Sequence, residues 1–118
     1  MSQLLMIASG KGGVGKSVTA VFLGRALAFL EKTVLLVETG AGLRGLDFML
    51  SPQKRVVYDL ADVLAGGCPP EQAVVADSHQ GNLHLIAAPT DAGFVTDAGA
   101  LGEFLALCRR HYDHVIID

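Results

Sequence analysis

The sequence predicts an α/β fold in three layers, with a parallel sheet that carries helices on both faces. Short runs of aliphatic residues alternate with longer segments of helical periodicity. The short runs are apolar throughout, which is typical of strands that are buried on both sides in a parallel sheet. The order is strand, helix, strand, two short helices, strand, helix, strand, and it requires right-handed crossovers between parallel strands.

The first half of the chain is expected to contain two strands and one long helix. Strands are predicted at residues 4–8 and 33–38, and a helix at 16–30. Residues 39–55 look irregular, with one helical turn at 46–50. The apolar side of the long helix, which we expect opposite Arg25 and Glu31, consists of Val18, Val21, Phe22, Ala26, Phe29 and Leu30.

The second half is expected to contain three helices and two strands. Asp59 is placed to cap a short helix that Gly66 ends. A second short helix is predicted at 69–75, and strands at 82–88 and 114–118. A longer helix begins near residue 97 with Thr96 as its cap, and its buried face is predicted to hold Leu101, Phe104, Leu105, Cys108 and Tyr112.

Length and composition limit the possible classes of protein. The 118 residues make at most one domain, and 51% hydrophobic with 18% charged residues indicates a globular fold. A net charge of -3 argues against a nucleic-acid partner. Cys68 and Cys108 lack metal-site spacing and are interpreted as inert thiols. Without a signal sequence or an apolar run of about 20 residues, the chain is predicted to be cytoplasmic.

A glycine-rich segment, "SGKGGVGKS" at residues 9–17, follows the first predicted strand directly. It matches G-x-x-x-x-G-K-[ST], in which glycine N–H groups converge on a phosphate chain at the start of a helix. Lys16 would contact the β- and γ-phosphates, and the Ser17 hydroxyl would bind Mg²⁺. The competing interpretation is a glycine-rich turn with two solvated lysines. The candidate nucleotide-binding residues are Gly10, Lys11, Gly12, Gly13, Val14, Gly15, Lys16, Ser17 and Val18.

The last predicted strand, "HVIID", ends in the carboxylate of Asp118. In phosphate-binding folds of this type, such an aspartate lies beside the glycine loop and holds Mg²⁺ through water. The alternative is an aspartate that caps the next turn. Together with the glycine loop, the metal role is the favoured interpretation.

The motif with its second lysine, "KGGVGKS", resembles the deviant Walker A motif of the MinD/ParA family of P-loop ATPases. Similar segments recur along the whole chain, with the greatest likeness to the MinD branch. The resemblance therefore implies a P-loop NTPase-type sheet and assigns residues 1–118 to the N-terminal part of one ATPase domain, truncated after the fourth strand. The matching segments are "GLRGLDFML", "RVVYDLADVLAGGCPPEQAVV", "NLHLIAAP" and "YDHVIID".

The resemblance also implies a function. Members bind ATP or ADP with Mg²⁺ and form a homodimer when ATP is bound, in which Lys11 reaches the partner's nucleotide; Lys11 and Lys16 are thus the candidate catalytic residues. Dimerisation would control association with a regulatory protein or with the inner face of the cell membrane, the latter through a C-terminal segment absent here, and so regulate septum placement. The alternative is an FlhG- or ParA-like regulator of flagellar number or DNA partition.

One departure from the family pattern concerns the second strand, which usually ends in Asp-x-Asp. Here Glu38 and Gly40 hold those places, and with Arg44 they are the switch-region candidates. Loss of a carboxylate that orients water lowers turnover by about 100-fold or more. Nucleotide binding is therefore expected, hydrolysis is left open, and a nucleotide-sensing scaffold with little or no hydrolysis is a further alternative.

The family arrangement puts the first strand near the middle of the full sheet. In the shorter chain this strand would stand at an edge with open N–H and C=O groups.

Overall fold

The computed structural model describes residues 2–7, 14–40, 45–50, 56–91 and 93–118. For residues 14–17 and 47–48 it describes the helix but not the side chains. Apart from one short strand, its elements are those predicted. In chain order they are β1 (Gln3–Met6), α1 (Val14–Phe29), β2 (Val34–Val37), α2 (Leu46–Leu50), α3 (Leu60–Leu64), α4 (Pro70–Ala73), β3 (Val75–Ala76), β4 (Leu83–Ile86), α5 (Ala98–Cys108) and β5 (His114–Ile117).

The strands form one mostly parallel sheet in the order β1-β5-β2-β4-β3. β5 lies between β1 and β2, and β4 pairs with the other side of β2, all in parallel. β3 pairs antiparallel with β4 and was not predicted. A helix was predicted through Val75, the first residue of β3, whereas α4 ends at Ala73 and the chain then extends beside β4.

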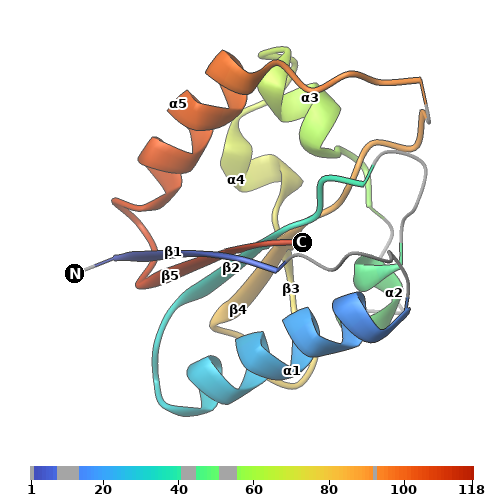
Figure 1. Ribbon diagram of the computed structural model, residues 1–118. Coiled ribbons are helices and arrows are strands. Elements are labelled where there is room, and N and C mark those ends of the chain that lie inside the picture. Colours follow the sequence, from blue (N-terminus) through green and yellow to red (C-terminus); the bar gives the residue numbers. More distant parts are fainter. Residues whose placement is uncertain (1, 8–13, 41–44, 51–55, 92) are drawn as a thin grey trace.

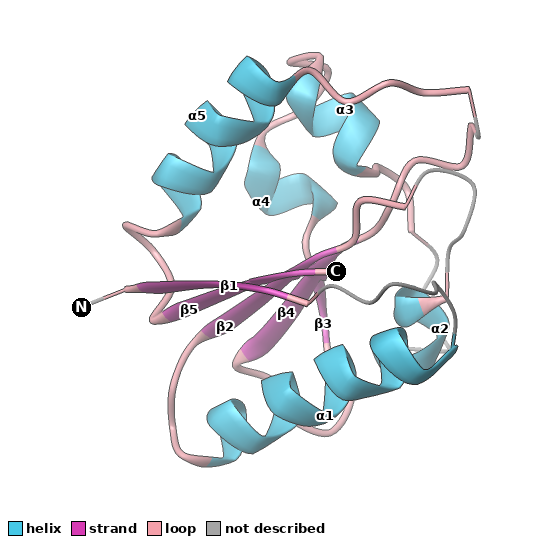
Figure 2. Cartoon of the chain, in the orientation of Figure 1, coloured by secondary structure: helices cyan, strands magenta, loops and turns pink. Residues whose placement is uncertain are grey.

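The predicted three-layer arrangement is confirmed (Figure 1). α1 and α2 cover one face of the sheet, and α3, α4 and α5 cover the other (Figure 2). The crossover through α1 leads from β1 to β2, and the crossover through α5 leads back from β4 to β5. Because these two crossovers run in opposite directions on opposite faces, they have the same hand, as the rule for parallel strands requires.

Two apolar cores lie on the two faces of the sheet, and β2 contributes to both. Leu35 and Val37 pack among residues of α3, α4 and α5. Val34 and Leu36 pack against α1 and α2. All four β2 residues are fully buried, because successive strand side chains point to opposite faces and both faces are covered.

The buried side of α1 differs from the predicted one. Of the predicted residues Val21 is buried, whereas Val18, Phe22, Ala26, Phe29 and Leu30 are exposed. The helix instead packs through Ala20, Ala28 and Gly24. A Cβ at Gly24 would come within 3.0 Å of a Leu83 methyl group, so small residues let the helix approach the sheet closely. Apolar residues occur on all sides of α1, and the periodicity of the sequence therefore could not identify the side that faces the sheet.

The ends of α3 agree with the prediction, whereas the predicted start of α5 is wrong. The Asp59 carboxylate accepts from Asp62 N and forms a capping box at α3. After this helix Gly66 adopts φ +76°, a conformation that glycine enters without strain. The predicted cap of α5, Thr96, is wrong, because the Asp97 carboxylate accepts from the N–H groups of Gly99 and Ala100.

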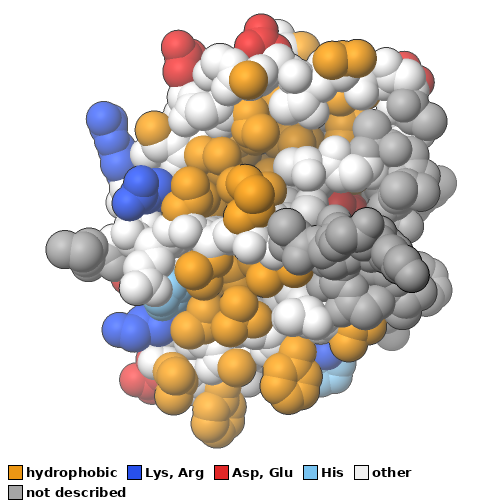
Figure 3. All heavy atoms as spheres, in the orientation of Figure 1, with side chains coloured by type: hydrophobic (Ala, Val, Ile, Leu, Met, Phe, Trp, Pro, Cys, Tyr) orange, Lys and Arg blue, Asp and Glu red, His pale blue; other side chains and the backbone are white. Residues whose placement is uncertain are grey.

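The expected edge position of the first strand is confirmed, since β1 is the first strand of the sheet order. Its Leu4 is 42% exposed and its Met6 is 72% exposed. Phe22 and Phe29 of α1 are also largely exposed. In Figure 3, hydrophobic side chains gather on the face that contains β1, both above and below this strand. We call this apolar face, which contains the edge strand β1, the open side.

Candidate functional site

The candidate site lies at the carboxyl edge of the parallel strands. The register aligns the last residues of four neighbouring strands: Met6, Ile117, Val37 and Ile86. In the sequence, residues 7–13 stand between the end of β1 and the start of α1, and they include the first part of the glycine-rich segment. In open α/β sheets, ligands bind outside the carboxyl ends of the strands. Among the described residues, Asp118, Glu38 and the start of α1 lie at this edge.

Asp118 follows β5 at this edge and lies between the ends of β1 and β2. It is 6% exposed. Its N–H donates to Val37 O (2.9 Å), and its carbonyl accepts from Thr39 N (2.9 Å) and Thr39 Oγ1 (2.9 Å). On the other side, Ile7 N donates to Ile117 O (2.8 Å). The structure therefore brings the predicted metal-side residue next to the strand that leads into the glycine loop.

The N-terminus of α1 lies at the same edge, with Val14, Gly15, Lys16 and Ser17 in its first turn. The first turn of a helix offers unpaired N–H groups and a partial positive charge. α1 carries no acidic residue there. Gly10, Lys11, Gly12 and Gly13 lie outside the described residues, as do the side chains of residues 14–17. Their predicted contacts with phosphate and metal stay predictions, and Val18 is 48% exposed.

The switch candidate Glu38 is 3% exposed. Its Oε1 accepts from Ala88 N (3.1 Å) and its Oε2 accepts from Leu46 N (3.3 Å). Gly40 is half-buried and brings no carboxylate to the edge. Arg44 lies outside the described residues. The structure thus places one of the three switch candidates in a set of defined contacts.

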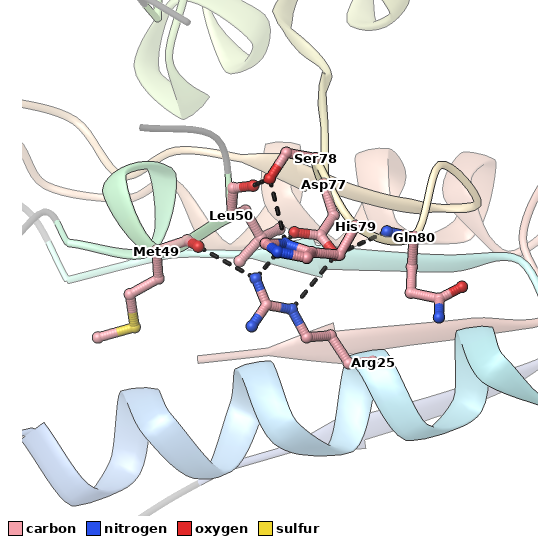
Figure 4. A network of polar contacts seen from close by, with 7 residues as sticks. All are labelled: Arg25, Met49, Leu50, Asp77, Ser78, His79 and Gln80. Atoms are coloured by element: carbon pink, nitrogen blue, oxygen red, sulfur yellow. Dashed lines mark hydrogen bonds and ion pairs between the residues drawn. The ribbon is translucent and has the colours of Figure 1, made fainter. Parts of the chain in front are cut away.

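A polar network that the sequence analysis missed connects α1 with α2 and the β3–β4 turn (Figure 4). Arg25 Nη2 and Nε donate to the two Asp77 carboxylate oxygens at 3.0 and 3.2 Å. Arg25 Nη2 also donates to Met49 O (3.1 Å), at the end of α2. The Asp77 side chain is fully buried. The available signal was a single arginine inside the otherwise uncharged segment 18–30.

A cavity of about 240 Å³ lies elsewhere, between α4, α5 and the sheet. It is largely apolar and includes none of the predicted site residues, so we assign it no part in the predicted chemistry. Cys108 lines it, and burial raises the pKa of this thiol to about 12. Burial, with Cys108 nearby, also raises the pKa of Tyr112 to about 12. Both groups are therefore neutral near pH 7, and the Cys108 thiol is unreactive.

The described part of the chain lacks two features. Its helices include none with the length and apolar character needed to cross a membrane. Within the same residues, no three His, Cys, Asp or Glu side chains come together as a metal-binding cluster. His84 contacts Tyr112 OH through Nδ1 at 2.7 Å.

Comparison with known proteins agrees with this geometry. The family described as "CobQ/CobB/MinD/ParA nucleotide binding domain" matches residues 5–114. The chain belongs to this family. Its relatives include the septum site-determining protein MinD of Bacillus subtilis, which is 40% identical over all of this chain and 45% of its own length. The protein is thus a MinD-like nucleotide-binding domain, and it spans about half the length of the relatives it matches.

Two solved structures of the family share this fold. MinD in the MinC:MinD complex of Aquifex aeolicus aligns with a TM-score of 0.85 and 38% identity, covering 99% of this chain and 47% of that one. The cobyrinic acid a,c-diamide synthase of Mycobacterium smegmatis with bound ADP and magnesium aligns with a TM-score of 0.82 and 32% identity, covering 100% and 51%. Family members of different function therefore use the same half-domain.

The described residues fit a magnesium nucleotide at the carboxyl edge. A helix N-terminus without acidic residues suits a phosphate. An aspartate on the adjacent strand suits a hydrated Mg²⁺ near that phosphate.

Proposed function

We propose that this chain is the nucleotide-binding part of a MinD-like ATPase switch. It binds Mg-ATP and Mg-ADP, dimerises in the ATP-bound state and so controls association with a regulatory protein or a membrane surface, in division-septum placement. The observation that carries the proposal is the shared carboxyl edge, where β1 ends before the glycine-rich segment, α1 begins, and Asp118 follows β5. The likeness to MinD proteins over the full chain supports the cellular role.

In this mechanism, main-chain N–H groups of residues 10–17 hold the phosphates, and Lys16 neutralises charge on the β- and γ-oxygens. Ser17 and Asp118 would hold Mg²⁺, Asp118 through water. Bound Mg²⁺ neutralises charge that develops on the transferred phosphate. Lys11 would add positive charge from one protomer to the nucleotide of its partner.

The largest expected effect of any substitution at the site is that of Lys16→Ala. Removing the ammonium group should weaken Mg-ATP binding by at least about 100-fold, because a charge-assisted contact with two phosphates is lost. Titration calorimetry with Mg-ADP and a non-hydrolysable ATP analogue measures the effect. Lys32→Ala, at an exposed lysine beyond the far end of α1, is the matched control. Unchanged affinity in a folded Lys16→Ala variant would contradict the proposal.

A second candidate function is a nucleotide sensor with little or no hydrolysis. It is favoured by Gly40, which brings no carboxylate to the edge, and by the buried position of Glu38. A general base must face the water that it activates, and the Glu38 oxygens accept hydrogen bonds from main-chain amides instead.

Gly40→Asp separates the two functions. If the missing carboxylate limits hydrolysis, this variant should raise phosphate release by about tenfold or more at unchanged nucleotide affinity. Gly45→Asp adds the same charge nearby, at a position where a Cβ would meet nothing within 4 Å, and should leave the rate unchanged. A wild-type rate equal to that of Gly40→Asp would show that Gly40 does not limit hydrolysis.

An FlhG- or ParA-like role in flagellar number or DNA partition stays an alternative within the same family. Pull-down with a MinC protein tests it, because selective capture by ATP-loaded chain favours the MinD-like role.

A further inference from the structure

Glu38 has an unusual position for an acidic residue, because it is 3% exposed at the end of the central strand β2. A buried carboxylate is costly unless hydrogen bonds compensate its lost hydration. Here Ala88 N donates to Oε1 at 3.1 Å, and Leu46 N donates to Oε2 at 3.3 Å. The side chain thus satisfies two buried main-chain donors from different parts of the chain.

These two donors belong to two different parts of the fold. Leu46 is the first residue of α2, and Ala88 lies two residues after β4. The Glu38 main-chain N–H also donates to Ile86 O at 3.0 Å. Residue 38 is therefore anchored to α2 through its side chain and to the exit of β4 through both its side chain and its main chain.

The far end of α2 is held independently. Arg25 of α1 donates to Met49 O at 3.1 Å. Ser78 donates to Leu50 O through both its N–H (2.9 Å) and its hydroxyl (3.0 Å). Because these contacts hold the C-terminal end of α2, the Glu38 side chain is bonded to an element that is also anchored independently of it.

The residues on each side of Glu38 hold Asp118. Val37 O accepts from Asp118 N, and Thr39 donates twice to the Asp118 carbonyl. Alternation along an extended chain explains this division, since the main-chain groups of residues 37 and 39 face β5 while those of residue 38 face β4. Glu38 is the middle residue of a three-residue span whose outer members set the position of Asp118.

We propose that Glu38 is a positioning residue for Asp118 in the magnesium nucleotide site, and not a general base. Its carboxylate anchors the exit of β2 to α2 and β4, and the anchored exit holds Asp118 at the carboxyl edge through Val37 and Thr39. This inference rests on the proposed function, in which Asp118 holds Mg²⁺. Groups that orient a metal-side residue usually change metal affinity by about 10- to 100-fold when they are removed.

The test compares Glu38→Ala and Glu38→Gln with wild type in the full chain. We expect Glu38→Ala to weaken nucleotide binding in the presence of Mg²⁺ by about tenfold, and binding in EDTA by less than about twofold. Glu38→Gln keeps one acceptor oxygen, and its affinity in Mg²⁺ should lie between those of wild type and Glu38→Ala. Calorimetry with ADP, in Mg²⁺ and in EDTA, measures both affinities. If Glu38→Ala does not fold, Glu38→Gln carries the test.

Asp113→Ala is the matched control. The Asp113 carboxylate also accepts a main-chain hydrogen bond, from Thr33 N at 2.9 Å, but it lies at the amino edge of the same strands. This variant should alter stability without changing the ratio of the affinities in Mg²⁺ and EDTA. An equal change of that ratio in both variants would overturn the positioning role.

Hydrogen exchange gives a second reading that does not depend on nucleotide. The Leu46 and Ala88 amides should exchange faster in Glu38→Ala than in wild type, whereas the Leu85 amide in β4 should not. Unchanged exchange at Leu46 and Ala88 would overturn the anchor itself.

The outcomes separate this inference from the proposed function. If wild type binds no magnesium nucleotide, the proposed function fails, and exchange still reports the anchor. If wild type binds and Glu38→Ala reduces the affinities in Mg²⁺ and EDTA equally, the positioning role fails and the function stands. A lost rate in Glu38→Gln with both affinities intact would indicate a general base.

Discussion

β1 and β2 are both short apolar strands of the same sheet, yet their surroundings are opposite. β2 lies between β5 and β4, and its four residues are buried on both faces. β1 is the first strand of the order, and three of its four residues are exposed. Two short runs with similar apolar residues thus differ in burial because of their positions in the sheet. The buried residues of β2 stabilise the domain, whereas the exposed residues of β1 leave apolar surface in contact with water.

The same contrast is found between the two sides of α1. Ala20, Val21 and Ala28 lie against the sheet, while Phe22 and Phe29 are 77% and 75% exposed. Exposed aromatic side chains on α1 and exposed apolar side chains on the edge strand β1 leave apolar surface in contact with water, and such surface commonly mediates association.

The largest effect is expected where the comparison is sharpest, between Leu36 of β2 and Leu4 of β1. Leu36→Ala should lower the free energy of unfolding by about 2–5 kcal/mol, because it leaves a cavity in a closed core. Leu4→Ala should cost below about 1 kcal/mol, because Leu4 is already 42% exposed. Urea denaturation measures both. Equal costs would mean that β1 is as closely packed as β2.

A smaller effect is expected from a charge on the open side. Met6→Lys should reduce self-association several-fold, because lysine on an edge strand hinders pairing with another strand, and it should change the free energy of unfolding by less than about 0.5 kcal/mol. Sedimentation velocity over a concentration series measures it. Val95→Lys adds the same charge at a side chain that is 86% exposed in a loop. The same reduction in both variants would point to net charge instead of the edge.

The smallest effect on the free energy of unfolding is expected at Asp113. Its carboxylate joins the amino ends of β2 and β5 and so stabilises the buried part of the sheet around β2. Hydrogen bonding from Thr33 N lowers the pKa of this carboxyl, assisted by the Thr33 hydroxyl and by Lys32 and His114. Since the pKa in the folded state lies below that in the unfolded state, the stabilisation is present above the unfolded value of about 3.9 and is lost as the pH falls through the folded one.

Asp113→Asn should therefore be less stable than wild type at pH 6, and the gap should close as the pH falls below about 4. Urea denaturation at several pH values measures it. Thr33→Val keeps the main-chain donor and should retain most of the effect. A gap that stays constant with pH would contradict the assignment.

The sequence was sufficient for the elements whose signals are local. The cap at Asp59, the turn at Gly66 and the buried face of α5 through Phe104 and Cys108 all appear as predicted. A glycine motif between a strand and a helix is also a local signal, contained within nine residues, and the site that it indicates stays a prediction.

Predictions failed where two local signals competed and where the structure depends on a partner that is distant in the sequence. Thr96 and Asp97 are both good caps, and the choice between them depends on where the chain enters α5. β3 has two residues, too few for a periodic pattern, and it exists because β4 offers it a neighbour. The ion pair of Arg25 with Asp77 could not be predicted either, because 52 residues separate the two partners.

The amino-acid sequence by itself determined the order of strands and helices, the family and the position of the nucleotide motif. These follow from short-range preferences and from spacing within single segments. Tertiary structure decided which side of α1 is buried, that β3 pairs with β4, and that Glu38 joins α2 and β4 beside Asp118. Such features depend on contacts between residues that are distant in the chain, and apolar character or charge at one position does not specify its partner.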